Sequence, residues 1–143
     1  MSGSGYDAFF HRSVDPRHAY TLLSELDLPE DIAAGKRSME PWAGNISGGE
    51  AKRLNVARLL SQPGEVNILD EPTTGLNVSL SHKTWKCILR YVEGSTLLCA
   101  THDLTFIDHF DRVLIVDAGR IVADLKPGEL KHNSHFAKIR DSL

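Results

Sequence analysis

Two short apolar runs with a helix between them constrain the fold of this chain more than any other feature. Residues 66–69 and 96–100 have the length of strands, and their apolar content predicts that both are buried. The helix between them, residues 79–92, has an apolar stripe made of Trp85, Ile88, Leu89 and Val92. Strands that alternate with helices predict an α/β fold with a largely parallel sheet. In such sheets, ligands bind beyond the carboxyl ends of the strands.

Helices are predicted before this unit. Asp15-Pro16 has the form of an N-cap followed by proline at the first helical position, and this helix ends near Pro29. Residues 47–60 form a second helix, because Ser47-Gly48-Gly49-Glu50 has the S-x-x-E pattern of a capping box. Two more strands, residues 112–116 and 120–123, are predicted after the unit, with a tight turn between them and a polar, helical tail behind them.

The overall composition excludes several classes of protein. The formal net charge of -3 gives no basic surface for nucleic acid or an anionic membrane. We find no apolar run as long as a membrane helix and no secretory signal, and residues 1–5 are interpreted as a flexible start or a tag remnant. The two cysteines, Cys87 and Cys99, lack the spacing of a metal site, so we expect inert thiols in a reduced, cytosolic chain.

The Ser47-Gly48-Gly49-Glu50 segment has two possible interpretations. Glycines at a helix N-terminus let the backbone approach a ligand, and the helix dipole and unpaired amides favour an anion there. With the Ser47 hydroxyl as a further donor, this segment is suited to binding phosphate. The alternative is an ordinary capped helix with glycines in its entry turn.

Acidic and imidazole side chains follow the two predicted strands. Asp70 could hold Mg²⁺ through water, and Glu71 could orient or deprotonate an attacking water. The alternative is a solvated acidic loop. His102 could bind a γ-phosphate or hold the water in line, although a lone histidine is also common as a structural residue. Both groups are predicted at the same edge of the sheet.

In their order and spacing, these segments resemble an ABC-family ATPase, the nucleotide-binding domain of an exporter-like ABC transporter. Residues 46–50 are similar to the signature usually written LSGGQ, and residues 66–71 resemble a Walker B strand with its catalytic glutamate. Residues 72–77 resemble the D-loop and residues 101–103 the H-loop. The late strands and the tail, to about residue 140, also resemble such domains.

The resemblance implies a partial P-loop NTPase-type core with a helical signature subdomain. The helical part would be residues 6–61 and the C-terminal part of the core residues 62–143. Ser47, Gly48, Gly49 and Glu50 would bind the γ-phosphate of ATP held by the opposite subunit. Within the chain's own site, Asp70 would serve Mg²⁺, Glu71 the attacking water and His102 the γ-phosphate.

The chain departs from the family pattern at several places. The 143 residues contain no G-x-x-x-x-G-K-[ST] segment, so the Walker A loop that cradles the phosphates is not among them. We therefore expect the isolated chain to neither bind ATP tightly nor hydrolyse it. Asn77 stands where the D-loop usually has aspartate, which weakens the expected contact across the dimer, and Asn67 interrupts the apolar Walker B run.

Expected partners follow from the family and from the unpaired strand edges. They are a second ABC ATPase domain or an N-terminal half with the P-loop, a transmembrane transporter subunit, or a second copy through self-association; no nucleic acid is expected. The assembled domain would lie in the cytoplasm at the inner face of the membrane. Two alternative functions remain open: a non-catalytic module that completes a partner's ATP site, and an ABC ATPase of DNA repair.

Overall fold

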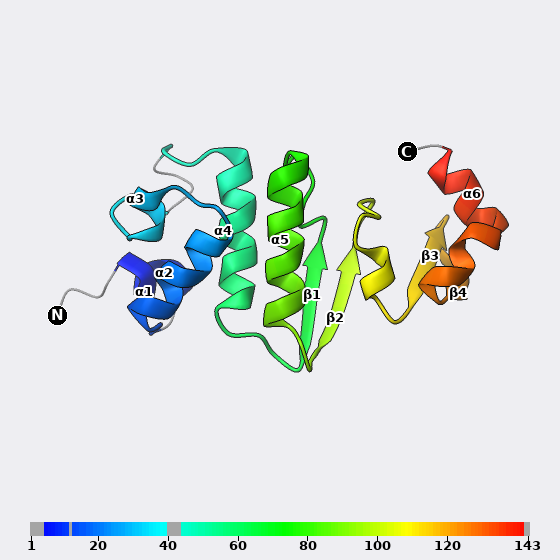
Figure 1. Ribbon diagram of the computed structural model, residues 1–143, viewed down its shortest axis with the longest axis horizontal. Coiled ribbons are helices and arrows are strands. Elements are labelled where there is room, and N and C mark those ends of the chain that lie inside the picture. Colours follow the sequence, from blue (N-terminus) through cyan, green and yellow to red (C-terminus); the bar gives the residue numbers. More distant parts are fainter. Residues whose placement is uncertain (1–4, 12, 40–43, 142–143) are drawn as a thin grey trace. The chain divides into compact units, whose positions relative to one another are not determined.

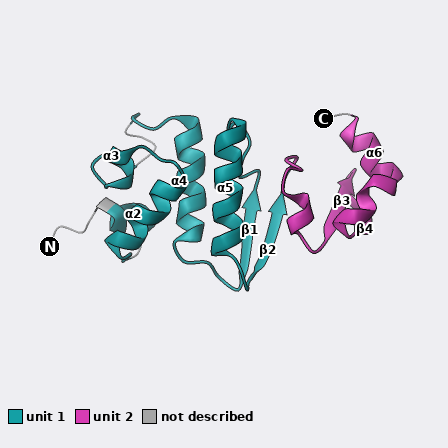
Figure 2. Ribbon diagram, in the orientation of Figure 1, with its two compact units in different colours: residues 1–101 teal, residues 102–143 magenta. Residues whose placement is uncertain are grey.

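The computed structural model describes residues 5–11, 13–39 and 44–141. The chain forms two compact units, residues 1–101 and residues 102–143, and each is described by itself (Figure 2). The predicted boundary between residues 6–61 and 62–143 stays a prediction, since the two units divide later in the chain. The predicted flexible start or tag at residues 1–5 falls almost entirely outside the described residues.

The first unit begins with three short helices (Figure 1). They are α1 (Gly5–Phe10), α2 (Pro16–Glu25) and α3 (Glu30–Ala33). The start of α2 was predicted correctly: the Asp15 carboxylate accepts a hydrogen bond from the Arg17 amide at 2.9 Å, and proline follows the cap. Helix α1 was not predicted, and it is anchored by the Tyr6 hydroxyl, which donates to the Ala33 carbonyl at 2.6 Å.

Two longer helices follow in this unit. Helix α4 (Gly48–Leu60) and helix α5 (Val78–Tyr91) lie side by side in Figure 1. Apolar residues of α2, α3, α4 and α5 are fully buried, as is Leu26 at the C-cap of α2; among them are Leu22, Leu23, Ile32, Leu60, Trp85 and Ile88. This burial is the main stabilising contribution for a helical unit of this kind.

The predicted parallel sheet is present as two strands, β1 (Val66–Asp70) and β2 (Thr96–Ala100). They pair in parallel from Val66 beside Thr96 to Asp70 beside Ala100, and α5 connects them. The carboxyl ends of both strands therefore meet at one edge, as expected for an α/β fold. The predicted fold class is confirmed.

The prediction that both strands are buried is wrong for one face of the sheet. Val66, Ile68 and Leu98 are 62%, 66% and 54% exposed, and these three residues share that face. The other face of β1 presents Asn67, which is only 3% exposed. The polar residue in the apolar run is thus the buried one. Its side chain explains this, because it bonds to Gly64, to the Ser95 hydroxyl and to the Thr96 carbonyl.

The second unit contains the predicted hairpin and tail. Strands β3 (Val113–Asp117) and β4 (Arg120–Leu125) are antiparallel, with a register shift between Ile115 and Val116. They follow a 3-10 turn, η2 (Ile107–His109), and precede η3 (Pro127–His132) and α6 (Ser134–Arg140). The residues that the structure describes thus form two two-stranded sheets. None of the described helices is both long enough and apolar enough to cross a membrane.

Candidate functional site

The Ser47 segment forms the predicted capping box at the start of α4. The Ser47 hydroxyl oxygen accepts from the Glu50 amide at 3.2 Å, and a Glu50 carboxylate oxygen accepts from the Ser47 amide at 3.0 Å. The capping bond uses a lone pair of the hydroxyl and leaves its proton available to a ligand. A reciprocal cap of this kind fixes the direction in which the chain enters the helix.

The first turn of α4 presents backbone amides at an accessible surface. Gly48 is exposed, and an added Cβ there would meet no atom within 4 Å. Amides of a first helical turn have no acceptor within the helix. Together with the dipole of this 13-residue helix, these amides favour the binding of an anion at the N-terminus of α4. Gly49 is tighter, because a Cβ there would lie 3.4 Å from the Leu76 side chain.

A charged network supports this turn from the side. Arg37 pairs with Asp31 at 2.8 Å and with Glu50 at 3.2 Å, and it also donates to the Asn45 carbonyl at 3.0 Å. The hydrogen bond from Arg37 lowers the pKa of the Asp31 carboxyl, and its partner Asp31 raises the pKa of Arg37. Arg37 therefore neutralises part of the Glu50 charge beside the proposed anion site.

Arg53 connects the same turn to the end of α2. Its guanidinium donates to the carbonyl of Gly49 at 3.1 Å, to that of Leu26 at 3.0 Å and also to that of Asp27. Burial lowers the pKa of Arg53, while Asp27 and Glu50 oppose that effect. The side chain thus satisfies carbonyls at the C-terminus of α2 that no amide of that helix can reach.

The predicted acidic pair lies at the carboxyl end of β1. Asp70 is the last residue of the strand and is exposed, and Glu71 follows it with a φ of 45°. This left-handed conformation costs a non-glycine residue on the order of 1 kcal/mol, so the surroundings must hold it in place. Backbone strain of this kind is common at functional sites.

Hydrogen bonds with Ala100, Thr74 and Lys52 hold Glu71, and one of them runs from the Thr74 amide to the Glu71 carbonyl at 3.4 Å. Its amide donates to the Ala100 carbonyl at 2.8 Å, and its carboxylate accepts from the Thr74 hydroxyl at 2.9 Å. The Lys52 ammonium donates to its carbonyl oxygen at 2.9 Å. Lys52 belongs to α4, so a residue of the signature helix contacts the loop that carries the predicted catalytic carboxylate.

The acidic pair suits Mg²⁺ only in combination with other ligands. Carboxylate oxygens are the ligands that Mg²⁺ prefers, and it is commonly held by one or two of them together with substrate phosphates and water. Among the described residues, no group of three His, Cys, Asp or Glu side chains could hold a metal by itself. Asp70, exposed at the strand end, fits the role of one such ligand.

His102 begins the second unit, whereas the other predicted site residues lie in the first. Its side chain is exposed, and it follows the end of β2 by two residues. The role of His102 beside Asp70 and Glu71 therefore stays a prediction.

Asn77, predicted to weaken a contact across a dimer, has a local role in the chain. Its side chain accepts from the Leu80 amide at 2.9 Å and caps α5. Asparagine and aspartate are about equally good at this position of a helix, so the substitution leaves the start of α5 intact.

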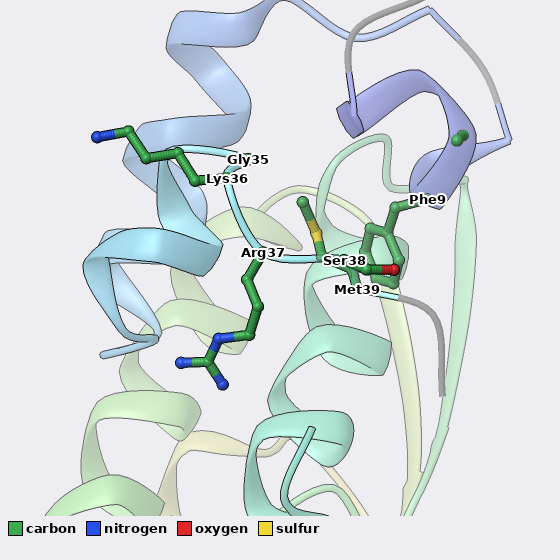
Figure 3. Close-up of a pocket in the computed structure, with 7 residues that line it drawn as sticks. Phe9, Gly35, Lys36, Arg37, Ser38 and Met39 are labelled. Carbon is green, nitrogen blue, oxygen red and sulfur yellow. The ribbon is translucent and has the colours of Figure 1, made fainter. Parts of the chain in front are cut away.

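A shallow cavity of about 260 Å³ lies elsewhere, between α1 and the loop after α3 (Figure 3). In Figure 3, Lys36 and Arg37 extend away from the Phe9 ring. The residues that line it are Ala8, Phe9, Gly35, Lys36, Arg37, Ser38 and Met39. This lining includes none of the predicted site residues, and we do not assign the nucleotide to it.

Known proteins with similar sequences indicate the family of this chain. A sequence model described as "ABC transporter" matches residues 7–74. These residues include Ser47–Glu50, called the signature turn below, and the acidic pair. Relatives named as ATP-binding/permease proteins match most of the chain. This chain belongs to the ABC transporter family. Its resemblance to exporter ATP-binding domains, predicted from the motifs, is confirmed.

Two relatives illustrate the extent of the likeness. The glutathione/L-cysteine transport system ATP-binding/permease protein CydC of Haemophilus influenzae is 31% identical over 82% of this chain. The ATP-dependent lipid A-core flippase of Alkalilimnicola ehrlichii is 34% identical over 85% of it. This chain spans only 22% of the length of the first relative and 20% of the length of the second.

Solved structures support the fold. A bacterial Atm1-family ABC exporter with ATP bound matches 98% of this chain with a TM-score of 0.80 at 19% identity, over 26% of the exporter chain. An ATP-binding cassette of an ABC transporter in its ADP conformation matches 89% of this chain with a TM-score of 0.61 at 22% identity, over 50% of its length.

The sequence did not point to Lys52 or Arg37 as supports of the site. Each contacts a residue far along the chain, Glu71 at a separation of 19 positions and Glu50 at a separation of 13. Neither position belongs to a recognisable pattern. A weak signal existed for Arg53, since the helix resembled the one that follows the signature in the family.

Proposed function

We propose that this chain is the signature-bearing part of an ABC transporter ATPase domain, which binds and hydrolyses ATP to drive transport in the complete assembly. The observation that carries the proposal is the capped N-terminus of α4, where Ser47 and Gly48 are exposed and the amides of Gly48 and Gly49 have no acceptor within the helix. In this proposal, the Ser47 hydroxyl and the amides of Gly48 and Gly49 bind the γ-phosphate of a nucleotide held by the opposite ATPase domain.

Hydrolysis at the chain's own site would use the edge where β1 ends. Mg²⁺, when bound with ATP, would neutralise developing charge on the phosphates. Asp70 would bind it through water, and the Glu71 carboxylate would orient the attacking water and take its proton. The Thr74 hydroxyl, 2.9 Å from that carboxylate, fixes its direction. His102 would donate to the γ-phosphate.

A segment with the Walker A loop must complete this second site, because residues 1–143 contain no such pattern. The exposed face of Val66, Ile68 and Leu98 is apolar and suits a companion segment that carries that loop. Without the companion, we expect the same face and the open strand edges to favour self-association. A transmembrane subunit and a position at the cytoplasmic face of the membrane belong to the same proposal.

Mixing the chain with an ABC ATPase domain that has its own P-loop tests the proposal. We expect the chain to raise ATP turnover of that domain, and Ser47→Arg to abolish the increase by filling the anion site. Ser24→Arg, at an exposed position of α2, serves as the matched control and should leave the increase unchanged. No increase with the wild-type chain at any ratio would contradict the proposed role of the signature turn.

Glu71→Gln distinguishes a chain that contributes its own hydrolytic site from one that only completes the ATP site of a partner. If the chain contributes its own hydrolytic site once a P-loop segment is supplied, this isosteric change should lower its share of turnover by about 100-fold or more. Unchanged turnover would assign the chain to the alternative of a non-catalytic module. The isolated chain should show no turnover in either form.

A further inference from the structure

We propose that Lys52 is a positioning residue that couples the signature turn to the Glu71 carboxylate of the same chain. The proposal rests on the proposed function for the roles of Ser47 and Glu71, and on the structure for the link between them. The Lys52 ammonium donates to the Glu71 carbonyl at 2.9 Å in a partly buried environment. A bond from a charged donor is stronger than one from a neutral donor.

The origin of its bond to Glu71 distinguishes Lys52 from Ala100 and Thr74. The acceptor Ala100 lies on the neighbouring strand and the donor Thr74 on the same loop, so both belong to the sheet and its edge. Lys52 alone among these three partners comes from α4. Because the left-handed backbone of Glu71 is strained, these bonds are needed to hold its conformation.

The hydrogen bonds in the first turn of α4 can transmit a displacement of Ser47 to Lys52. The capping box closes its first turn, the Ala51 amide donates to the Ser47 carbonyl at 2.8 Å, and Arg53 braces the Gly49 carbonyl at 3.1 Å. A hydrogen-bonded turn of this kind moves as a unit. A shift of the signature turn therefore shifts the ammonium that holds the Glu71 carbonyl.

The consequence concerns communication between two ATP sites. In the proposed function, Ser47 contacts the nucleotide of the opposite domain, whereas Glu71 acts on the nucleotide of its own. Lys52 joins the two over five residues of one helix. Occupation of the opposite site would then adjust the position of Glu71 in this one, as a coupling between sites requires.

Nuclear magnetic resonance of the isotope-labelled 143-residue chain tests the link without any ATPase activity. Lys52→Met keeps most of the aliphatic stem and removes the donor, and it should shift the Glu71 carbonyl resonance and speed exchange of the Glu71 amide about tenfold. Lys52→Arg should restore both wild-type values. Lys86→Met, at an exposed position of α5, controls for the loss of a lysine and should change neither.

The coupling itself is tested with Ser47→Ala, which removes the cap at the other end of the turn. The change should alter the Glu71 resonances in the wild-type background and leave them unaltered in the Lys52→Met background. An unshifted Glu71 carbonyl in Lys52→Met, or an effect of Ser47→Ala that persists in full without the ammonium, would overturn the proposal. Neither result depends on whether the chain hydrolyses ATP.

Kinetics with Mg-ATP provide the functional readout in an assembly of this chain with a P-loop-bearing segment. Misplacement of Glu71 should lower kcat about tenfold in Lys52→Met while KM stays within about twofold, and Lys52→Arg should recover the rate. A change in KM alone would contradict a positioning role. Absence of turnover in the wild-type assembly would instead reject the proposed function, and the resonance shifts would still decide the link.

Discussion

Arg53 donates a hydrogen bond from its Nε atom to the carbonyl oxygen of Gly49 at 3.1 Å, and the same guanidinium reaches the Leu26 carbonyl at 3.0 Å. One buried side chain thus joins the signature turn to the end of α2. Arg53→Met should destabilise the chain by about 2–4 kcal/mol, because carbonyls at both places lose their donor. Urea denaturation followed by circular dichroism measures this difference.

Arg17→Met supplies the control for the Arg53 substitution. Arg17 is exposed on α2, so its replacement should change the free energy of unfolding by no more than about 0.5 kcal/mol. Equal effects of the two substitutions would show that the Arg53 bonds contribute nothing specific.

Thr84 offers an opportunity to stabilise the chain. Its side chain is fully buried in α5, and within the described part of the chain its hydroxyl oxygen has no hydrogen-bond partner. Thr84→Val exchanges this hydroxyl for a methyl group of similar size and should raise the free energy of unfolding by about 1 kcal/mol. Thr84→Ser, which keeps the hydroxyl and loses the methyl, should lower it by a similar amount. A loss of stability in the valine variant would imply that the hydroxyl has a buried water as partner.

The two thiols should be unreactive in the folded chain. Burial raises the pKa of Cys87 from 9.0 to about 11 and that of Cys99 to about 12, where the charges of Glu71 and Asp70 add to the effect. At pH 8, alkylation of Cys87 should be about 100-fold slower than that of an exposed thiol, and that of Cys99 slower still. Mass spectrometry after timed treatment with iodoacetamide measures both rates, and denaturant should restore ordinary reactivity.

The same pKa shifts predict the direction of a change in stability with pH. A thiol whose pKa is raised on folding binds its proton more tightly in the folded state. Its contribution is therefore fully present below pH 9 and is lost as the pH rises through about 11 for Cys87. Cys87→Ala should make unfolding less sensitive to pH in that window. Rapid labelling of the native chain at pH 8 would contradict both expectations.

The exposed sheet face can be tested through the oligomeric state. Ile68 is 66% exposed at the centre of that face, and Ile68→Lys should reduce self-association by placing a charge there. Light scattering over a range of concentrations should show a mass closer to that of one chain for the variant than for the wild type. Val78→Lys is the control, since Val78 is 76% exposed and belongs to α5 instead of a strand. Equal association of the wild type and Ile68→Lys would rule out this face as the contact.

The parts of the fold that could be predicted from the sequence depend on local chemistry. The caps at Asp15 and Ser47 each involve atoms within three residues, so their patterns identify the helix starts directly. The strands and the hairpin follow from apolar runs and a turn in the same way. The capping box, the α/β class and the family resemblance were therefore accessible without a structure.

The parts that could not be predicted depend on pairing across the chain. Asn67 interrupts the apolar run in the sequence, yet its amide donates to Ser95 and Thr96, almost thirty positions later, and these hydrogen bonds let it be buried. The exposure of Ile68 follows from which face of the sheet the helices cover, and a run of apolar letters carries no such information. Lys52 and Glu71 meet only because α4 and β1 pack in the same unit.

The two glycines of the signature turn differ in how much space they have, and this affects how any substitution there should be interpreted. A side chain at Gly49 would be in contact with Leu76, in the loop that follows Glu71, whereas one at Gly48 would meet open space. A bulky residue at position 49 would therefore affect the loop after Glu71 as well as the proposed contact with a partner's nucleotide. Loss of activity in such a variant has two causes at once. Under the proposed function, Gly48 is the position at which contact with the nucleotide can be probed without disturbing that loop.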